Sequence, residues 1–180
     1  MTSDDAAPPT QPIRRPNLAR DIALSLSVLL LPLLLLMAFC RPTGSELPTV
    51  DPNRTYQAAK AEAKFPVLVP ISLPAGWRAT NATLNRLEGG GLTVRVSYLT
   101  PGDRFVQLVQ SDADSEDLIV DELGAGKIQG TNEIRGEQWQ RYSGRRDGET
   151  ALVWLRPEST VLASGDATVN ELTALTSALR

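Results

Sequence analysis

The chain has 180 residues, with 18 Lys or Arg against 21 Asp or Glu and a net charge of −3 at neutral pH. This balance lacks the basic footprint of nucleic-acid-binding proteins, so we expect no nucleic-acid partner. The chain has no histidine and a single cysteine, Cys40. Ser-His-Asp and Cys-His catalysis, imidazole zinc sites and disulfides within the chain are therefore excluded.

The first 20 residues are rich in proline. Pro8, Pro9, Pro12 and Pro16 stand there among small and polar residues, a composition with too little apolar content to pack. We predict a disordered cytoplasmic tail over residues 1–20.

The run Ile22–Cys40 carries no charge over 19 residues. A helix of that length covers about 28 Å, close to the hydrocarbon thickness of a bilayer. We therefore predict a transmembrane helix over residues 21–41, with the lipid bilayer as its partner. Basic residues are more numerous before the run than just after it, which keeps the N-terminus cytoplasmic and places the remainder of the chain outside the cell. These basic residues are Arg14, Arg15 and Arg20 before the run and Arg41 after it.

The end of this run bears on whether the anchor is retained. Signal peptidase needs small residues in an A-x-A-like pattern, and Phe39 stands where a small residue is wanted. Lipid attachment to Cys40 is also disfavoured, because bulky Phe39 precedes it and Arg41 follows it. A retained single-pass anchor in the cell membrane is the favoured reading, and cleavage and lipidation stay open.

Residues 42–50 contain Pro and Gly and read as a linker, which leaves residues 51–180 as one extracytoplasmic domain. Asp51-Pro52 has the pattern of a helix start, and alanine-rich sequence continues the predicted helix to Ala63. Val67–Val69 reads as a short strand.

The rest of the domain alternates between strand and helix patterns. Apolar and polar residues alternate in the segments predicted as strands, and glycines or prolines separate them. A closing pair of glycines follows one predicted helix. The predicted strands are 78–87, 92–98, 104–110, 127–134, 138–143, 150–156 and 160–163, and the predicted helices are 115–123 and 169–179. This order predicts an α+β fold, an antiparallel sheet covered by helices.

The densest acidic cluster contains Asp112, Asp114, Glu116 and Asp117. An EF-hand loop starting at Asp112 would need glycine at the sixth position and glutamate at the twelfth, and it has neither. Acids at a helix start cap exposed amides and complement the helix dipole, which is the interpretation we favour. We expect no metal site and no cofactor.

A second candidate feature combines aromatic and basic residues at Trp139, Arg141, Arg145 and Arg146. Arginine and aromatic residues are enriched at binding hot spots, and a pair of arginines near a turn suits an anionic ligand. Simple alternation of core aromatics with solvent-facing charges also explains the pattern. These four residues are our predicted binding residues, and we predict no catalytic residue.

Five segments carry a resemblance to a known family. They are Tyr56–Ala59, Phe65–Pro70, Leu73–Arg78, Ser97–Pro101 and Trp139–Tyr142. With them the chain resembles an actinobacterial family of single-pass membrane proteins classed only as a domain of unknown function. That family implies no substrate and no site residues.

The Leu73–Trp77 turn, after an opening helix and strand, is also similar to the start of Mog1/PsbP-like domains. That resemblance implies a sandwich of helices around a sheet and a noncatalytic binding role.

We therefore predict a noncatalytic module of the cell envelope that binds an envelope protein or a small ligand. One alternative is a histidine-free hydrolase or transferase whose carboxylates are drawn from Asp112, Asp114 and Glu116. Another is a carrier that holds an apolar ligand between sheet and helix.

Overall fold

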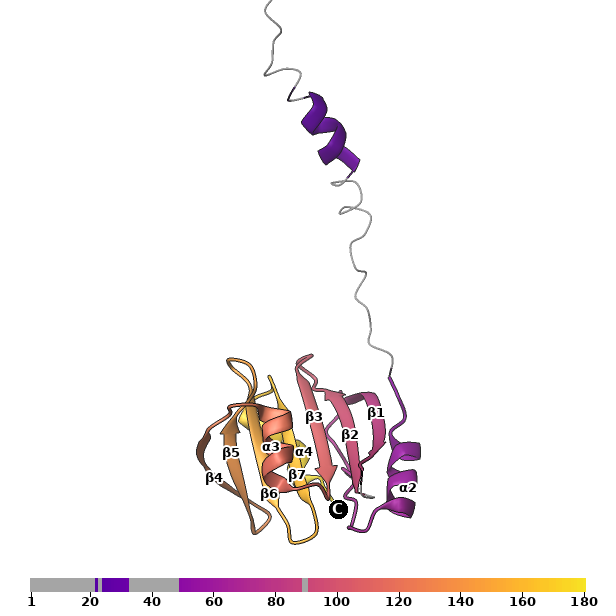
Figure 1. Cartoon of the computed structure of the whole chain (residues 1–180), viewed down its shortest axis with the longest axis vertical. Helices are drawn as coiled ribbons and strands as arrows, with labels where there is room; N and C mark the ends of the chain where they lie inside the picture. The colour runs from indigo at the N-terminus through magenta and orange to yellow at the C-terminus, as the bar shows by residue number, and fades with distance from the viewer. Residues whose placement is uncertain (1–21, 23, 33–48, 89–90) are drawn as a thin grey trace, which may run out of the picture. The chain divides into compact units, whose positions relative to one another are not determined.

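The computed structural model describes residues 22, 24–32, 49–88 and 91–180 (Figure 1). The chain divides into two units at Glu46, and Leu47–Arg180 is compact. Ile22 and residues 24–32 are helical. No helix within the described ranges is both long and apolar enough to cross a membrane. The predicted tail, the end of the predicted anchor and most of the predicted linker lie outside the described residues.

The compact unit contains three helices and seven strands whose bounds follow the predicted pattern closely. In chain order they are α2 (Asn53–Glu62), β1 (Arg78–Arg86), β2 (Leu92–Leu99), β3 (Phe105–Ser111), α3 (Ser115–Leu123), β4 (Ile128–Ile134), β5 (Glu137–Ser143), β6 (Thr150–Leu155), β7 (Thr160–Gly165) and α4 (Val169–Ser177). The predicted strand at Val67–Val69 is wrong, because in that region only Pro70 makes an isolated bridge, to Leu179.

All seven strands form one antiparallel sheet in the order β1-β2-β3-β7-β6-β5-β4. The β1–β3 and β4–β7 blocks are meanders, in which neighbours in sequence are neighbours in space. A long-range pairing of β3 with β7 joins the blocks, with Val109 opposite Leu162. The α+β prediction of an antiparallel sheet covered by helices is thus confirmed.

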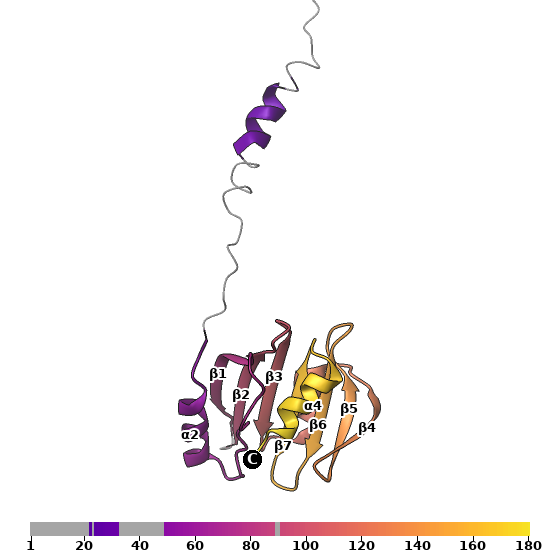
Figure 2. The same ribbon diagram turned by 180° about the vertical axis from the view of Figure 1, so that it is seen from behind.

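The helices cover both faces of the sheet. Figure 1 shows α3 in front of the sheet, and Figure 2, seen from behind, shows α4 on the other side. We call these the α3 face and the α4 face. On the α4 face, α2 and α4 contribute Tyr56, Leu172 and Leu175 to one buried cluster, whereas on the α3 face Leu118 and Leu123 pack in a second cluster. Each fully buried side chain of this kind stabilises the fold by about 1.5–3 kcal/mol.

Side chains cap the two C-terminal helices at their starts. Asp114 accepts hydrogen bonds from the backbone N–H groups of Glu116 and Asp117 at 2.9 and 3.1 Å, which confirms the capping interpretation of the acidic cluster. At α4, Thr168 and Glu171 form a reciprocal capping box. Hydrogen bonds from the Thr100 side chain and then from the Thr168 backbone hold the pKa of Glu171 below its usual range.

Two buried tyrosines connect α2 to the sheet. The hydroxyls of Tyr56 and Tyr98 lie 3.0 Å apart, and Trp77 packs edge-on against Tyr98. Burial raises the pKa of Tyr98 to about 12, and burial with the neighbouring Tyr98 raises the pKa of Tyr56 further. Burial also raises the pKa of Tyr142.

The segment between α2 and β1 is fixed by the end of the chain. The backbone N–H of Val69 donates to Arg180 O at 2.9 Å, and Arg180 N–H donates back at 3.1 Å. Gln110, which is 1% exposed, accepts from the N–H of Leu68 and donates to its C=O, each at 2.8 Å. One buried side-chain amide therefore does here what a neighbouring strand would do.

Candidate binding site

Two tryptophans lie side by side on the α4 face. Trp139 of β5 and Trp154 of β6 flank the paired residues Gln140 and Val153, and their ring centroids are 5.4 Å apart. Trp139 is only 2% exposed. The guanidinium of Arg156 lies 4.9 Å from the Trp154 ring centroid, a cation–π contact that fixes the more accessible ring.

A hollow of about 220 Å³, which we call the tryptophan hollow, opens beside these rings. Its walls are mainly apolar, and its rim is charged. The walls are Leu68, Ile134, Trp139, Trp154 and Leu179, and the charged rim is Arg135, Glu137 and Arg180. Apolar walls with a few polar groups at the rim are typical of binding sites. The hollow lies between the end of α4 and the sheet, where the sequence allowed an apolar ligand.

The rim is built at a tight turn between β4 and β5. Arg135 and Gly136 both have positive φ, 57° and 81°, which is the two-residue type I′ hairpin geometry. From this turn the Arg135 guanidinium donates to Leu179 O at 2.8 Å and to Ser177 O at 3.4 Å. It therefore shares with Arg180 the carbonyls at and just after the C-terminus of α4, where a cation also complements the helix dipole.

Arg141 lies one step further along β5 on the same face. Its cross-strand partner is Gly130, and that of Trp139 is Asn132. The Arg141 Nε and the Asn132 Oδ1 are buried without a hydrogen-bond partner. Among the described residues Arg141 also forms no ion pair. A guanidinium with a buried, unbonded Nε and no anion is unusual, because burying a polar group is costly unless it is hydrogen-bonded.

Arg145 and Arg146 lie at the opposite end of β5, in the loop before β6. Arg145 donates to the backbone carbonyl of Asp121 at the end of α3, and Arg146 pairs with Glu149 at 3.4 Å. Both arginines line a more polar hollow of about 480 Å³ on the α3 face, with Phe105 among its other walls. The structure thus brings Trp139 and Arg141 together and separates them from the other two predicted residues.

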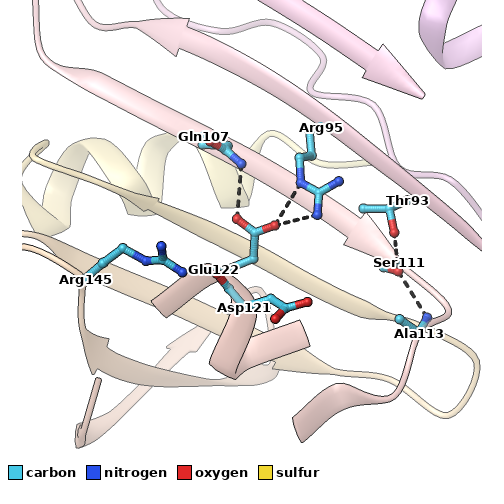
Figure 3. A network of polar contacts seen from close by, with 8 residues as sticks. All are labelled: Thr93, Arg95, Gln107, Ser111, Ala113, Asp121, Glu122 and Arg145. Atoms are coloured by element: carbon cyan, nitrogen blue, oxygen red, sulfur yellow. Dashed lines mark hydrogen bonds and ion pairs between the residues drawn. The ribbon is translucent and has the colours of Figure 1, made fainter. Parts of the chain in front are cut away.

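The polar network on the α3 face is shown in Figure 3. Glu122 of α3 is the central residue, and its side chain is 13% exposed. One of its oxygens accepts from the Arg95 guanidinium at 2.8 Å and the other from Gln107 at 3.2 Å (Figure 3). Because both oxygens have partners, this carboxylate holds α3 on the sheet and is poorly placed to serve as a catalytic acid or base.

Of the three carboxylates proposed for catalysis, Glu116 is exposed in the first turn of α3, and Asp112 and Asp114 make structural contacts. Asp112 Oδ1 accepts from the backbone N–H of Leu92 at 2.6 Å, and Asp114 caps α3. In the part of the chain that the structure describes, no three His, Cys, Asp or Glu residues are grouped so that they could hold a metal ion.

Sequence reasoning identified one wall of the tryptophan hollow, Trp139, and missed the others. Trp154 could have been found from the sequence, since the side chains of its predicted strand alternate between the two faces and that strand must pair with a neighbouring strand. Leu68 and Leu179 had none, because their positions depend on the pairing of the chain end with a segment more than a hundred residues away.

No curated protein matches the chain. The family model described as "Protein of unknown function (DUF4245)" matches residues 14–179, which is nearly the entire sequence. The chain therefore belongs to the DUF4245 family.

Proposed function

We propose that residues 47–180 form a noncatalytic binding domain and that the tryptophan hollow captures a side chain of a protein partner. The observation that carries this proposal is the hollow itself, an apolar recess over a tryptophan pair with a charged rim. Aromatic anchors in water-poor recesses, surrounded by a polar rim, are the usual centres of protein–protein recognition.

The size of the hollow favours a side chain over a metabolite. Sites for small molecules usually enclose about 300–1,000 Å³. The tryptophan hollow has about 220 Å³, which suits one large apolar side chain. This comparison favours a protein partner over an apolar-ligand carrier.

The position of the hollow suits a tethered domain. The chain enters the domain where Val50 N–H donates to Ala79 O, at the end of the sheet that also holds the β5–β6 loop. The hollow lies at the other end, beside the Ile134–Glu137 turn, as does the C-terminus (Figure 1). The hollow is therefore at the end of the sheet opposite to Val50, which is near the first described residues of the domain.

The cellular setting is part of this proposal. The uncharged run Ile22–Cys40 supports a membrane anchor with a cytoplasmic N-terminus, an extracytoplasmic domain and a partner in the cell envelope. Helices on both faces of the sheet support the proposed likeness to Mog1/PsbP-like sandwiches. That likeness is one of layer order, and it supports a binding role by analogy.

Site-specific photocrosslinking in cells tests this function. A benzophenone amino acid replaces Glu137 at the rim, and a control chain carries it at Asn85, an exposed residue of the opposite edge strand. We expect a protein adduct from position 137 that is lost when Trp154→Leu is added, and no such adduct from position 85. An adduct that survives Trp154→Leu, or turnover of envelope glycans, peptides or esters by the purified chain, would refute the proposal.

A further inference from the structure

The outer edge of β4 is open to another strand. β4 ends the sheet, and a two-residue turn joins it to β5. In such a hairpin the residues flanking the turn bond to each other, and bonded pairs then alternate with unbonded ones. The backbone N–H and C=O groups of Thr131 and Glu133 therefore point away from β5. Within the described ranges, no backbone hydrogen bond reaches these groups from another segment.

A missing side chain exposes Arg141 toward this edge. The β4–β5 register shifts between Ile128 and Gly130, and Gly130 then lies opposite Arg141 on the α4 face. A Cβ on Gly130 would lie 3.5 Å from Nη2 of Arg141. Because glycine has no side chain, the space between the guanidinium and an incoming strand is free. Bulges of this kind often redirect side chains at sheet edges.

The charge of Arg141 indicates what would fill that space. This guanidinium has neither an ion pair nor a hydrogen bond within the described residues, and its Nε is fully shielded. A carboxylate is the natural complement, since bidentate arginine–carboxylate pairs are among the strongest charge-assisted hydrogen bonds. Next to it, the Asn132 Oδ1 has no hydrogen-bond partner and could accept from a donor on the incoming strand.

We propose that β4 receives an extended segment of the partner protein as an eighth strand, and that a Glu or Asp of this segment pairs with Arg141 above Gly130. This inference rests on the proposed function, that the domain binds a protein. Side chains of an added strand alternate between faces, so every second one reaches the α4 face. The recognised pattern is an acid opposite Gly130, a hydroxyl residue opposite Asn132 and an apolar residue opposite Ile134, beside the tryptophan hollow.

A second copy of this chain does not fit the requirement. If two β4 strands paired edge to edge, the copy would offer its own Gly130, Asn132 and Ile134 on the α4 face. None of these side chains is acidic, and Glu133 lies on the other face. A different protein with an acidic strand therefore suits the edge better than a homodimer.

Fluorescence anisotropy with the full-length chain tests the inference. The probes are fluorescein-labelled peptides in which Leu, Thr and Glu occupy every second position, in this order for an antiparallel strand and in reverse for a parallel one. Matched peptides carry Gln in place of Glu. The variants are Arg141→Gln and Arg86→Gln, which removes the same charge from the other edge strand.

We expect one direction of the Glu peptide to bind the unaltered chain and the Arg86→Gln chain equally. Arg141→Gln and the Glu-to-Gln peptide should each weaken binding about tenfold, and together they should cost little more than either alone. Equal affinity for the Glu and Gln peptides, or no binding in either direction, overturns the inference.

A second variant tests the backbone pairing without touching the charge. Thr131→Pro removes an outward N–H that β5 does not use, and edge strands tolerate proline at such positions. We expect it to abolish peptide binding while the thermal unfolding transition stays cooperative. If the cellular adduct from position 137 still depends on Trp154 but persists in Arg141→Gln and Thr131→Pro, the binding function stands and the acidic-strand inference is wrong.

Discussion

Gln110 connects the stability of the fold to the shape of the tryptophan hollow. Its amide holds both backbone groups of Leu68, at 2.8 Å each, and Leu68 forms one wall of the hollow. Replacing Gln110 by Leu keeps the side chain similar in size but removes its amide, and with it both hydrogen bonds to Leu68. We expect the segment around Leu68 to loosen and the hollow to open.

The size of the effect follows from these contacts. Two hydrogen bonds contribute about 1 kcal/mol each, and leaving an N–H and a C=O poorly solvated adds a further cost of about 1–3 kcal/mol. The new apolar side chain recovers about 1 kcal/mol. Gln110→Leu should therefore lower the free energy of unfolding by about 3 kcal/mol, a large part of the stability of an ordinary domain.

Urea denaturation followed by tryptophan fluorescence measures this loss. Gln107→Leu is the matched control, because Gln107 is on the same strand but faces α3 and donates one 3.2 Å hydrogen bond to Glu122. We expect the control to cost about 1 kcal/mol. Equal losses in the two variants would contradict the role assigned to Gln110.

Gln110→Glu adds a pH signature to the same test. A carboxylate can accept from Leu68 N–H but repels Leu68 O, whereas a protonated carboxyl can donate to that oxygen. Folding should therefore raise the pKa of the introduced group. Its stabilising contribution is then present at low pH and disappears as pH rises through the folded-state pKa. A variant whose stability relative to the unaltered chain does not fall between acid and neutral pH would contradict this reasoning.

Three further outcomes are expected. Because the pKa of Glu171 is lowered, its stabilising contribution is present above the ordinary carboxyl pKa and is lost as pH falls through the lowered value. In the Glu171→Gln variant the free energy of unfolding should therefore fall less steeply with decreasing pH. All three tyrosines of the chain have raised pKa values, so their stabilising contribution is present below about pH 10 and is lost above it. In an alkaline titration, tyrosinate absorbance should therefore appear only as the domain unfolds. Arg141→Met should leave the free energy of unfolding unchanged or raise it by up to about 1 kcal/mol in urea titrations, since it removes a buried Nε without an acceptor and a charge without an anion. A loss above that size would contradict this account.

Local sequence patterns were sufficient for the elements and for much of the topology. The alternation around Val94 and Val96, the glycines after α3 and the leucines of α4 each act within one element, so the predicted bounds agree closely with the structure. The pairing of β3 with β7 depends on contacts between distant segments, for which one sequence gives no local signal. Val67–Val69 looked like a strand for a good local reason, but Gln110 and the chain end replace the neighbouring strand that it would need.

The candidate site shows the same limit. Alternation correctly puts Trp139 and Arg141 on one face of β5. A strand rises about 3.3 Å per residue, so the four residues of β5 beyond Trp139 alone cover about 13 Å before the loop with Arg145, too far for a single small site. This separation could have been worked out from the sequence. The tryptophan hollow could not, because four separate segments close it.

The two edges of the sheet differ in a way that bears on function. At β1, the backbone of Val50 bonds to Ala79, so part of that edge is covered by the chain itself. At β4, no such cover exists in the described residues, and Gly130, the unpaired Arg141 and the unpartnered Asn132 oxygen lie together. An open strand edge favours aggregation, and a buried polar atom without a hydrogen bond lowers stability. Proteins retain such features chiefly where function requires them. Their coincidence on one edge is best explained if a partner supplies the missing strand, donor and anion together.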